Sequence, residues 1–303
     1  DPCRLVRQVN KFGQLDEHPY RDVSWNPRGP SMMPTPLYAA ENARPAYELR
    51  YGWTGWLSVG GLLPVALDGA IKAAAVEWEA DALRLLEQRM SGKMVQLVLS
   101  ALPHVGPVLL AARVKGRLQH ALRNMGCAAG FSRKLAVRSV GHNHRADVER
   151  YIEQQVAKAT FHDPAFTQRL GKYSVIDPAV DLSEPTETHS GRYWYNLHLV
   201  LVNEERYQRS DDKWLERILE CCFAIGRKKG HAISRLSVMP DHLHMALRGN
   251  VAHSPQEIAL AFQNNLAYAM GSLRVFQATY YVGTFGEYDM QAVRHGHGAS
   301  GSN

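Results

Sequence analysis

Hydrophobic and polar positions alternate along this chain with two periods, and the same order of periods occurs twice. A period of two residues is typical of a half-buried strand, whereas apolar residues three and four apart indicate a helix. In the second half these patterns predict strands at 195–202 and 232–239, a helix at 211–230, a third strand after Pro240 and a helix after Ser254. In the first half they predict strands at 47–58, 94–101 and 108–113 and helices at about 68–90 and 115–124.

Two short matches support an internal repeat. Residues 99–103 (Leu-Ser-Ala-Leu-Pro) resemble 236–240 (Leu-Ser-Val-Met-Pro), and residues 135–141 resemble 280–286, each of the latter pair ending in glycine. The first match aligns Val105, Gly106 and Pro107 with residues 242–244. The expected fold class is α+β, built from two copies of one unit.

Segments rich in Pro, Gly and Ser divide the chain into parts. We predict an N-terminal extension at 1–45, a first unit at 46–161, a linker at 162–191, a second unit at 192–294 and a flexible tail at 295–303.

Composition limits the class of protein. With 303 residues, 45% of them hydrophobic, each unit can bury a core, which argues against a disordered or fibrous chain. The 35 Lys and Arg against 29 Asp and Glu leave a formal charge of +6, which suits a polyanionic partner.

Four cysteines without a Cys-x-x-Cys pair are too few for a disulfide scaffold, so we expect a reducing cytoplasm. The apolar runs at 57–76 and 94–114 contain charged residues or prolines and do not predict membrane spans. The chain does not begin with a signal-peptide pattern, so the expected location is cytoplasmic.

The segment His242-Leu243-His244 carries the first sign of chemistry. Because side chains alternate along a strand, both imidazoles point to one face while Leu243 faces the core. Two neutral imidazole nitrogens directed at one point are suited to a metal ion. A lone His-x-His also occurs in many proteins without a metal, and its setting after Pro240-Asp241 in an apolar strand strengthens the interpretation.

Residues 194–286, with Pro-Asp-His-Leu-His after a strand and Tyr-Tyr-Val-Gly-Thr-Phe-Gly near the end, resemble the single-tyrosine HUH transposases of bacterial insertion sequences. The resemblance implies ferredoxin-like domains that bind Mg²⁺ or Mn²⁺ through two histidines. It further implies that a helix-borne tyrosine cuts single-stranded DNA and that a polar residue four positions later completes the metal shell.

The second half departs from this pattern, because the position matching the nucleophile is Gly296, while Tyr288 is too early and Tyr268 lies on the preceding helix. The first half carries the missing string in Tyr151-Ile-Glu-Gln-Gln155 but has lost the histidines. Family members act as dimers that can share a site in this way. The resemblance therefore implies a fused tandem pseudo-dimer, two domains packed about a pseudo-twofold axis, with one composite site.

In that site Tyr151 is the expected nucleophile, and His242, His244 and Gln155 are the expected ligands of Mg²⁺ or Mn²⁺. Residues i and i+4 share a helix face, so Tyr151 and Gln155 could approach one metal. A site with oxygen and imidazole ligands favours the hard cations Mg²⁺ or Mn²⁺ over Zn²⁺, although two histidines alone do not exclude Zn²⁺. The implied product is a 5′-phosphotyrosine and a free 3′-hydroxyl.

The expected partner is single-stranded DNA, with the hairpin ends of a mobile element implied by the resemblance. Cationic side chains that could contact phosphate are Lys115, Arg117, Arg123, Lys134, Arg138, Arg227, Lys228 and Lys229, each of which could equally be solvated surface. Aromatic residues that could stack on bases or belong to the core are Tyr193, Trp194, Tyr280 and Tyr281.

Two other functions remain open at this stage. A domesticated nucleic-acid-binding protein that does not cleave would keep the basic surface without needing a nucleophile. A replication-initiator or relaxase-like nickase would use the same site for one nick, and the sequence does not distinguish it from a transposase.

Overall fold

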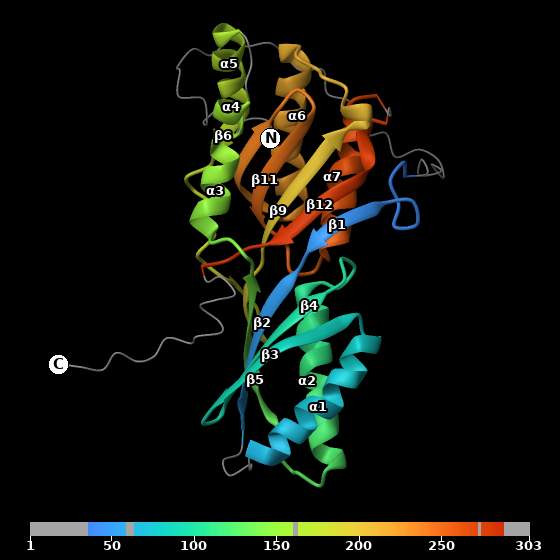
Figure 1. Cartoon of the computed structure of the whole chain (residues 1–303), viewed down its shortest axis with the longest axis vertical. Coiled ribbons are helices and arrows are strands. Elements are labelled where there is room, and N and C mark those ends of the chain that lie inside the picture. The colour runs from blue at the N-terminus through green and yellow to red at the C-terminus, as the bar shows by residue number, and fades with distance from the viewer. Residues whose placement is uncertain (1–35, 59–63, 160–162, 272–273, 288–303) are drawn as a thin grey trace, which may run out of the picture.

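The computed structural model describes residues 36–58, 64–159, 163–271 and 274–287. The strands form two six-stranded sheets, one above the other in Figure 1, and helices pack against both. The α+β class predicted from the hydrophobic periods is thereby confirmed. No helix in these described ranges is long and apolar enough to cross a membrane.

The upper sheet in Figure 1 has the order β1-β12-β9-β11-β10-β6. Neighbouring strands are antiparallel except β1, which runs parallel to β12. The strands are β1 (Arg44–Glu48), β12 (Phe276–Thr284), β9 (Asn196–Asn203), β11 (His242–Arg248), β10 (Ala232–Val238) and β6 (Ser174–Ile176).

The lower sheet has the order β3-β4-β2-β5-β8-β7, with only β5 and β8 parallel. The strands are β3 (Leu83–Ser91), β4 (Met94–Ala101), β2 (Arg50–Leu57), β5 (Phe131–Val140), β8 (Gly191–Trp194) and β7 (Thr186–Glu187). The series β3-β4-β2-β5 repeats the series β10-β11-β9-β12 in strand direction and chain order, and each series is followed in its sheet by a parallel strand, β8 or β1.

Each half contributes one short strand to the sheet of the other. Only Leu49 separates β1 from β2, and only Tyr195 separates β8 from β9, so one chain segment enters both sheets at each crossing. Because the backbone groups of β1 and β8 pair with the opposite half, the halves are joined by main-chain hydrogen bonds as well as by side chains. The origin of this arrangement in a fused dimer stays a prediction.

Helices cover the sheets unequally. Helices α1 (Pro64–Ala80) and α2 (Pro107–Asn124) pack on the lower sheet, and α6 (Asp212–Lys229) and α7 (Pro255–Ala269) pack on the upper one. Leu243, Met245 and Leu247 of β11 join the core on the α6 and α7 side, whereas Ala246 packs with Val148 and Ile152 of α3 (Arg145–Glu153). Since neighbours on a strand point to opposite faces, α3 of the first half covers the second face of the upper sheet.

Two predictions for the first half were wrong. The segment 108–113 belongs to α2, in which Leu110, Val114 and Leu118 are buried at helical spacing and Pro107 occupies the first turn, where its missing N–H costs nothing. The segment 68–90 is divided: α1 ends at Ala80, and β3 begins at Leu83 as an edge strand. The strands at 94–101, 195–202 and 232–239 and the helix at 211–230 are confirmed within a few residues.

The alignment of Val105, Gly106 and Pro107 with the histidines was also wrong, because these residues lead into and begin α2. The strand register gives the correct equivalence: Ser139 pairs with Tyr51, which pairs with Leu99, and Thr284 pairs with Leu197, which pairs with Leu247. The match of 135–141 with 280–286 agrees with this register. Counting back along β4 and β11, Met94 corresponds to His242 and Gln96 corresponds to His244.

The predicted linker contains the helix α5 (Pro164–Leu170) and the strands β6 and β7, each of which forms an edge of one sheet, and β8 begins at its last residue, Gly191. A short helix, α4 (Gln155–Lys158), precedes it, and single 3₁₀ turns lie at Gly171–Tyr173 and Glu204–Arg206. The extension through residue 35, residues 160–162, Tyr288, Gly296 and the tail at 295–303 lie outside the described residues.

The close approach of the two halves at Gly141 provides a test of the fold. A Cβ atom at Gly141 would lie 2.4 Å from the carbonyl oxygen of Thr284, a backbone atom that cannot move away alone. We expect Gly141→Ala to lower the free energy of unfolding by about 1–3 kcal/mol, the usual cost of overpacking, in urea denaturation. The matched control is Gly116→Ala in α2, where a Cβ atom meets nothing within 4 Å and should stabilise by roughly 0.5–1 kcal/mol. Equal stability of the two variants would contradict this close approach of Gly141 to Thr284.

Candidate active site

A cavity of about 550 Å³ opens between α3 and the upper sheet. Its walls come from both halves of the chain, since Tyr151 and Lys158 belong to the first half and His198, His244 and Tyr281 to the second. The remaining lining residues are Asn143, Asp147, Val148, Arg150, Gln154 and Val200.

The structure brings Tyr151 to the histidines. The centroid of its ring lies 5.5 Å from that of His244 and 6.0 Å from that of His198, both edge to face. His242 does not line the cavity, but its ring centroid lies 4.9 Å from that of His244. The structure therefore places Tyr151 next to His244 in one chain, while the composite site and the roles of Tyr151 and the two histidines stay predictions.

Helix α3 is held on the upper sheet by polar contacts with the second half. At its start, the backbone N–H of Arg145 donates to the carbonyl of Gly286 at 2.8 Å. Along its length, Arg235 of β10 donates to Glu153 at 2.5 Å, and Ser234 donates to Glu149 at 3.3 Å in a buried position. Contacts at both ends fix the helix that carries Tyr151.

His198 and His244 form a hydrogen-bonded pair, with Nε2 of His198 3.0 Å from Nδ1 of His244. Burial lowers the pKa of His198 to about 4. Burial, with the nearby His198 and His242, lowers the pKa of His244 to about 2. Both rings are therefore neutral at pH 7, and each offers one N–H and one lone pair.

His242 is oriented by its neighbour in sequence. Its Nδ1 lies 2.6 Å from a carboxylate oxygen of Asp241, whose other oxygen lies 3.3 Å from Arg206. A carboxylate only accepts hydrogen bonds, so Nδ1 of His242 carries a proton. In the neutral ring Nε2 then carries the lone pair and is the atom that could bind a cation.

Gln155 occupies a different position from the one expected. The helix breaks at Gln154, between α3 and α4, and the amide of Gln155 donates to the backbone carbonyl of Tyr151 at 2.9 Å. Gln155 is buried, and Gln154 lines the cavity in its place. The i, i+4 argument assumed one uninterrupted helix, and the structure does not bring Gln155 to the histidines in the way that argument requires.

Cationic side chains lie at the same cavity. The ammonium of Lys158 is 4.6 Å from the centroid of the Tyr151 ring, close enough for a cation–π interaction. Arg150 also lines the cavity and forms an ion pair with Asp147 at 3.3 Å. A phosphate entering the cavity would meet positive charge next to Tyr151.

The donor set fits a divalent cation only in part. Within residues 36–58, 64–159, 163–271 and 274–287, no group of three or more His, Cys, Asp and Glu is arranged to hold a metal ion. His242 and His244 would supply two imidazole nitrogens, so the remaining ligands would have to be amide, water or phosphate oxygens. Such a mixed set suits Mg²⁺ or Mn²⁺.

None of the eight predicted phosphate contacts lines the cavity. Arg117 is paired with Asp81 at 2.9 Å, and Lys115 donates to the carbonyl of Ser132. Arg138 lies 3.6 Å above the ring of Trp194. Arg123 donates to a carbonyl within α2, Lys134 is exposed on β5, and Arg227, Lys228 and Lys229 form the last turn of α6.

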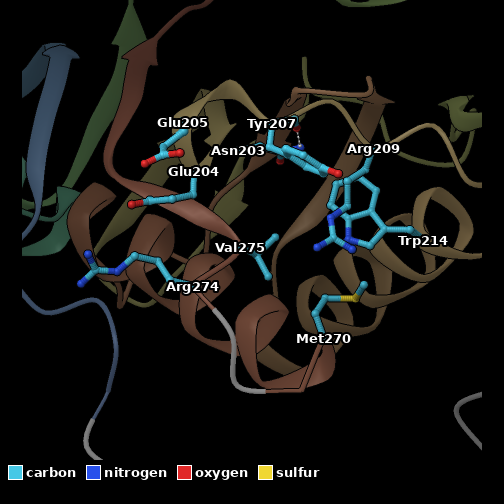
Figure 2. Close-up of a pocket in the computed structure, with 9 residues that line it drawn as sticks. All are labelled: Asn203, Glu204, Glu205, Tyr207, Arg209, Trp214, Met270, Arg274 and Val275. Atoms are coloured by element: carbon cyan, nitrogen blue, oxygen red, sulfur yellow. Dashed lines mark hydrogen bonds between the residues drawn. The ribbon is translucent and has the colours of Figure 1, made fainter.

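A second cavity of about 270 Å³ lies where β9 ends (Figure 2). Tyr207, Arg209 and Trp214 gather on one side of it, with Glu204, Glu205 and Arg274 on the other; Asn203, Met270 and Val275 complete the lining. The amide of Asn203 donates to the carbonyl of Pro240 at 2.8 Å, so this cavity adjoins the turn before His242. None of the predicted catalytic residues lines it.

Sequence reasoning missed His198 and Lys158. His198 lies in the alternating run at 195–202, and the same period of two that placed His242 and His244 would have identified its face. Of the aromatic candidates, Tyr281 lines the cavity, with its ring centroid 5.7 Å from that of His198, whereas Tyr193 and Tyr280 are buried.

Comparison with known proteins found a similar solved structure and a matching family model. A solved structure of a candidate transposase from Deinococcus radiodurans R1 is 18% identical, and the match covers 33% of this chain and 82% of that chain with a TM-score of 0.28. Among curated proteins, none matches. The family model described as "Transposase IS200 like" matches residues 192–295, the segment that contains β9, β11 and both histidines. Over these residues the chain is similar to the IS200-like transposase family.

Proposed function

We propose that this protein is a transposase that cuts and rejoins single-stranded DNA at one active site, with Tyr151 as nucleophile. The observation that supports this most is the ring of Tyr151 from the first half, 5.5 Å from that of His244 in the second. The first half has the tyrosine but not the histidines, and the second half has the histidines. Tyr151 and His244 line the same cavity.

In the proposed reaction, the phenol oxygen of Tyr151 attacks phosphorus and the bond from phosphorus to the 3′-oxygen breaks. The phenol loses its proton to water, the departing 3′-oxygen gains one, and the 5′-phosphate remains on Tyr151. A 3′-hydroxyl from another strand reverses these steps and joins the strands without ATP, because the phosphodiester bond energy is conserved.

The residues at the cavity support these steps. His242 and His244 would hold Mg²⁺ or Mn²⁺, which, when bound, supplies positive charge for a non-bridging phosphate oxygen. Lys158 adds positive charge beside the tyrosine, whose phenol is a poor nucleophile in its protonated form. Gln155 remains a proposed ligand that would have to leave its contact with the Tyr151 carbonyl.

The test uses both strands of the DNA that flanks the gene, as labelled single strands that fold into hairpins. With Mg²⁺ or Mn²⁺ we expect cleavage and a denaturation-resistant shift of the protein, and neither in EDTA. Tight binding without any cut would favour a domesticated binding protein. A single nick without strand joining would favour a nickase, and undiminished cleavage in EDTA would remove the metal from the mechanism.

A further inference from the structure

We propose that His198 is a positioning residue: its Nε2 accepts a hydrogen bond from Nδ1–H of His244 and leaves Nε2 of His244 free for the cation. This inference rests on the proposed function, since it assigns how one of its metal ligands is held. It concerns a residue outside the His-x-His segment and outside the tyrosine helix.

The hydrogen bond allows two arrangements of the protons. Its length of 3.0 Å requires one proton between the two nitrogens, supplied by either ring. If His198 donated, the proton of neutral His244 would be on Nε2, and that nitrogen would present N–H in place of a lone pair. Only the arrangement in which His244 donates leaves it able to bind a cation.

The neighbouring ligand has this same arrangement. Asp241 holds Nδ1 of His242 at 2.6 Å and leaves its Nε2 free. The two histidines then present equivalent nitrogens, one ring held by a carboxylate and the other by an imidazole. His244 is buried, and its acceptor, His198, has no formal charge. A carboxylate in place of His198 would be a buried charge without a partner.

The ring of His198 is fixed by its surroundings. His198 pairs with Ala246 across β9 and β11, so it is the diagonal neighbour of His244 on the same face of the sheet. Edge-to-face contacts with Tyr281 and Tyr151, at 5.7 and 6.0 Å between centroids, limit its rotation. An acceptor held in this way can fix the orientation of its partner.

The lower sheet offers an internal comparison. By strand register, Gly52 corresponds to His198 and Gln96 to His244. Both members of the pair are therefore replaced in the half that has no histidine site, as expected if His198 acts through His244.

The test measures the proton position directly in the full chain. In the metal-free protein labelled with ¹⁵N-histidine, long-range ¹H–¹⁵N spectra should show His244 protonated on Nδ1, with the resonance assigned by its loss in His244→Gln. A proton on Nε2 of His244 overturns the proposal. This readout does not depend on cleavage, so a wrong tautomer and an inactive protein are distinguishable failures.

A second measurement tests the consequence. Mn²⁺ binding, followed by electron paramagnetic resonance, should weaken about 10- to 100-fold in His198→Leu, the usual effect of losing a partner of a metal-bound histidine. His198→Gln, whose amide oxygen can accept the same hydrogen bond, should retain affinity within a few-fold. The control His231→Gln removes a buried histidine away from the cavity and should change nothing. Equal affinity in folded His198→Leu and wild type would overturn the proposal.

Discussion

Replacing Tyr151 with phenylalanine is expected to abolish the covalent protein–DNA adduct and to slow strand cleavage on the order of 10³-fold or more, as for other covalent nucleophiles. The substitution removes one oxygen. Tyr151 is 42% exposed, and no hydrogen bond of its hydroxyl is found within the described residues. The free energy of unfolding should therefore change by less than about 0.5 kcal/mol, and DNA binding should persist.

The controls are two other tyrosines of the second half. Tyr281 lines the same cavity, and Tyr268 is exposed on α7. Tyr281→Phe and Tyr268→Phe should still form the adduct, detected as a gel shift that survives denaturation. An adduct that persists in Tyr151→Phe would show that another residue is the nucleophile.

The second large effect is expected from the histidines. His242→Ala or His244→Ala removes one of two neutral nitrogen donors, and cation stabilisation of a reacting phosphate is worth several kcal/mol, on the order of 10³-fold in rate. Gln155→Ala should weaken cleavage less and shift the dependence on metal concentration. Cleavage at the wild-type rate in both histidine variants would exclude them as ligands.

Mixing variants tests whether one chain forms the whole site. Since α3 covers the upper sheet of its own chain, a mixture of Tyr151→Phe and His244→Ala proteins should remain inactive. Both proteins must be folded, which thermal unfolding checks. Restored cleavage would mean that Tyr151 of one chain reaches the histidines of another.

Local patterns were sufficient where the chemistry depends on neighbours in sequence. The alternation in His242-Leu243-His244 gave the shared face of the two imidazoles, and the match of 135–141 with 280–286 agrees with the strand register. The same reasoning failed at 108–113, because a short apolar run has no clear period and Pro107 can equally begin a helix. For Gln155 it assumed one continuous helix, whereas the helix breaks at Gln154 and the amide of Gln155 donates to the carbonyl of Tyr151.

The sequence by itself determined that the chain has two α+β units and that the histidines and the tyrosine belong to different units. Side-chain direction along a strand or helix repeats with a local period, so these features can be read without the fold. Only the tertiary structure decided that α3 lies on the opposite sheet, that Met94 and Gln96 replace the histidines in the lower sheet, and that His198 contacts His244. These facts depend on strand order and register between distant segments, which hydrogen bonds across the sheets fix and no local period encodes.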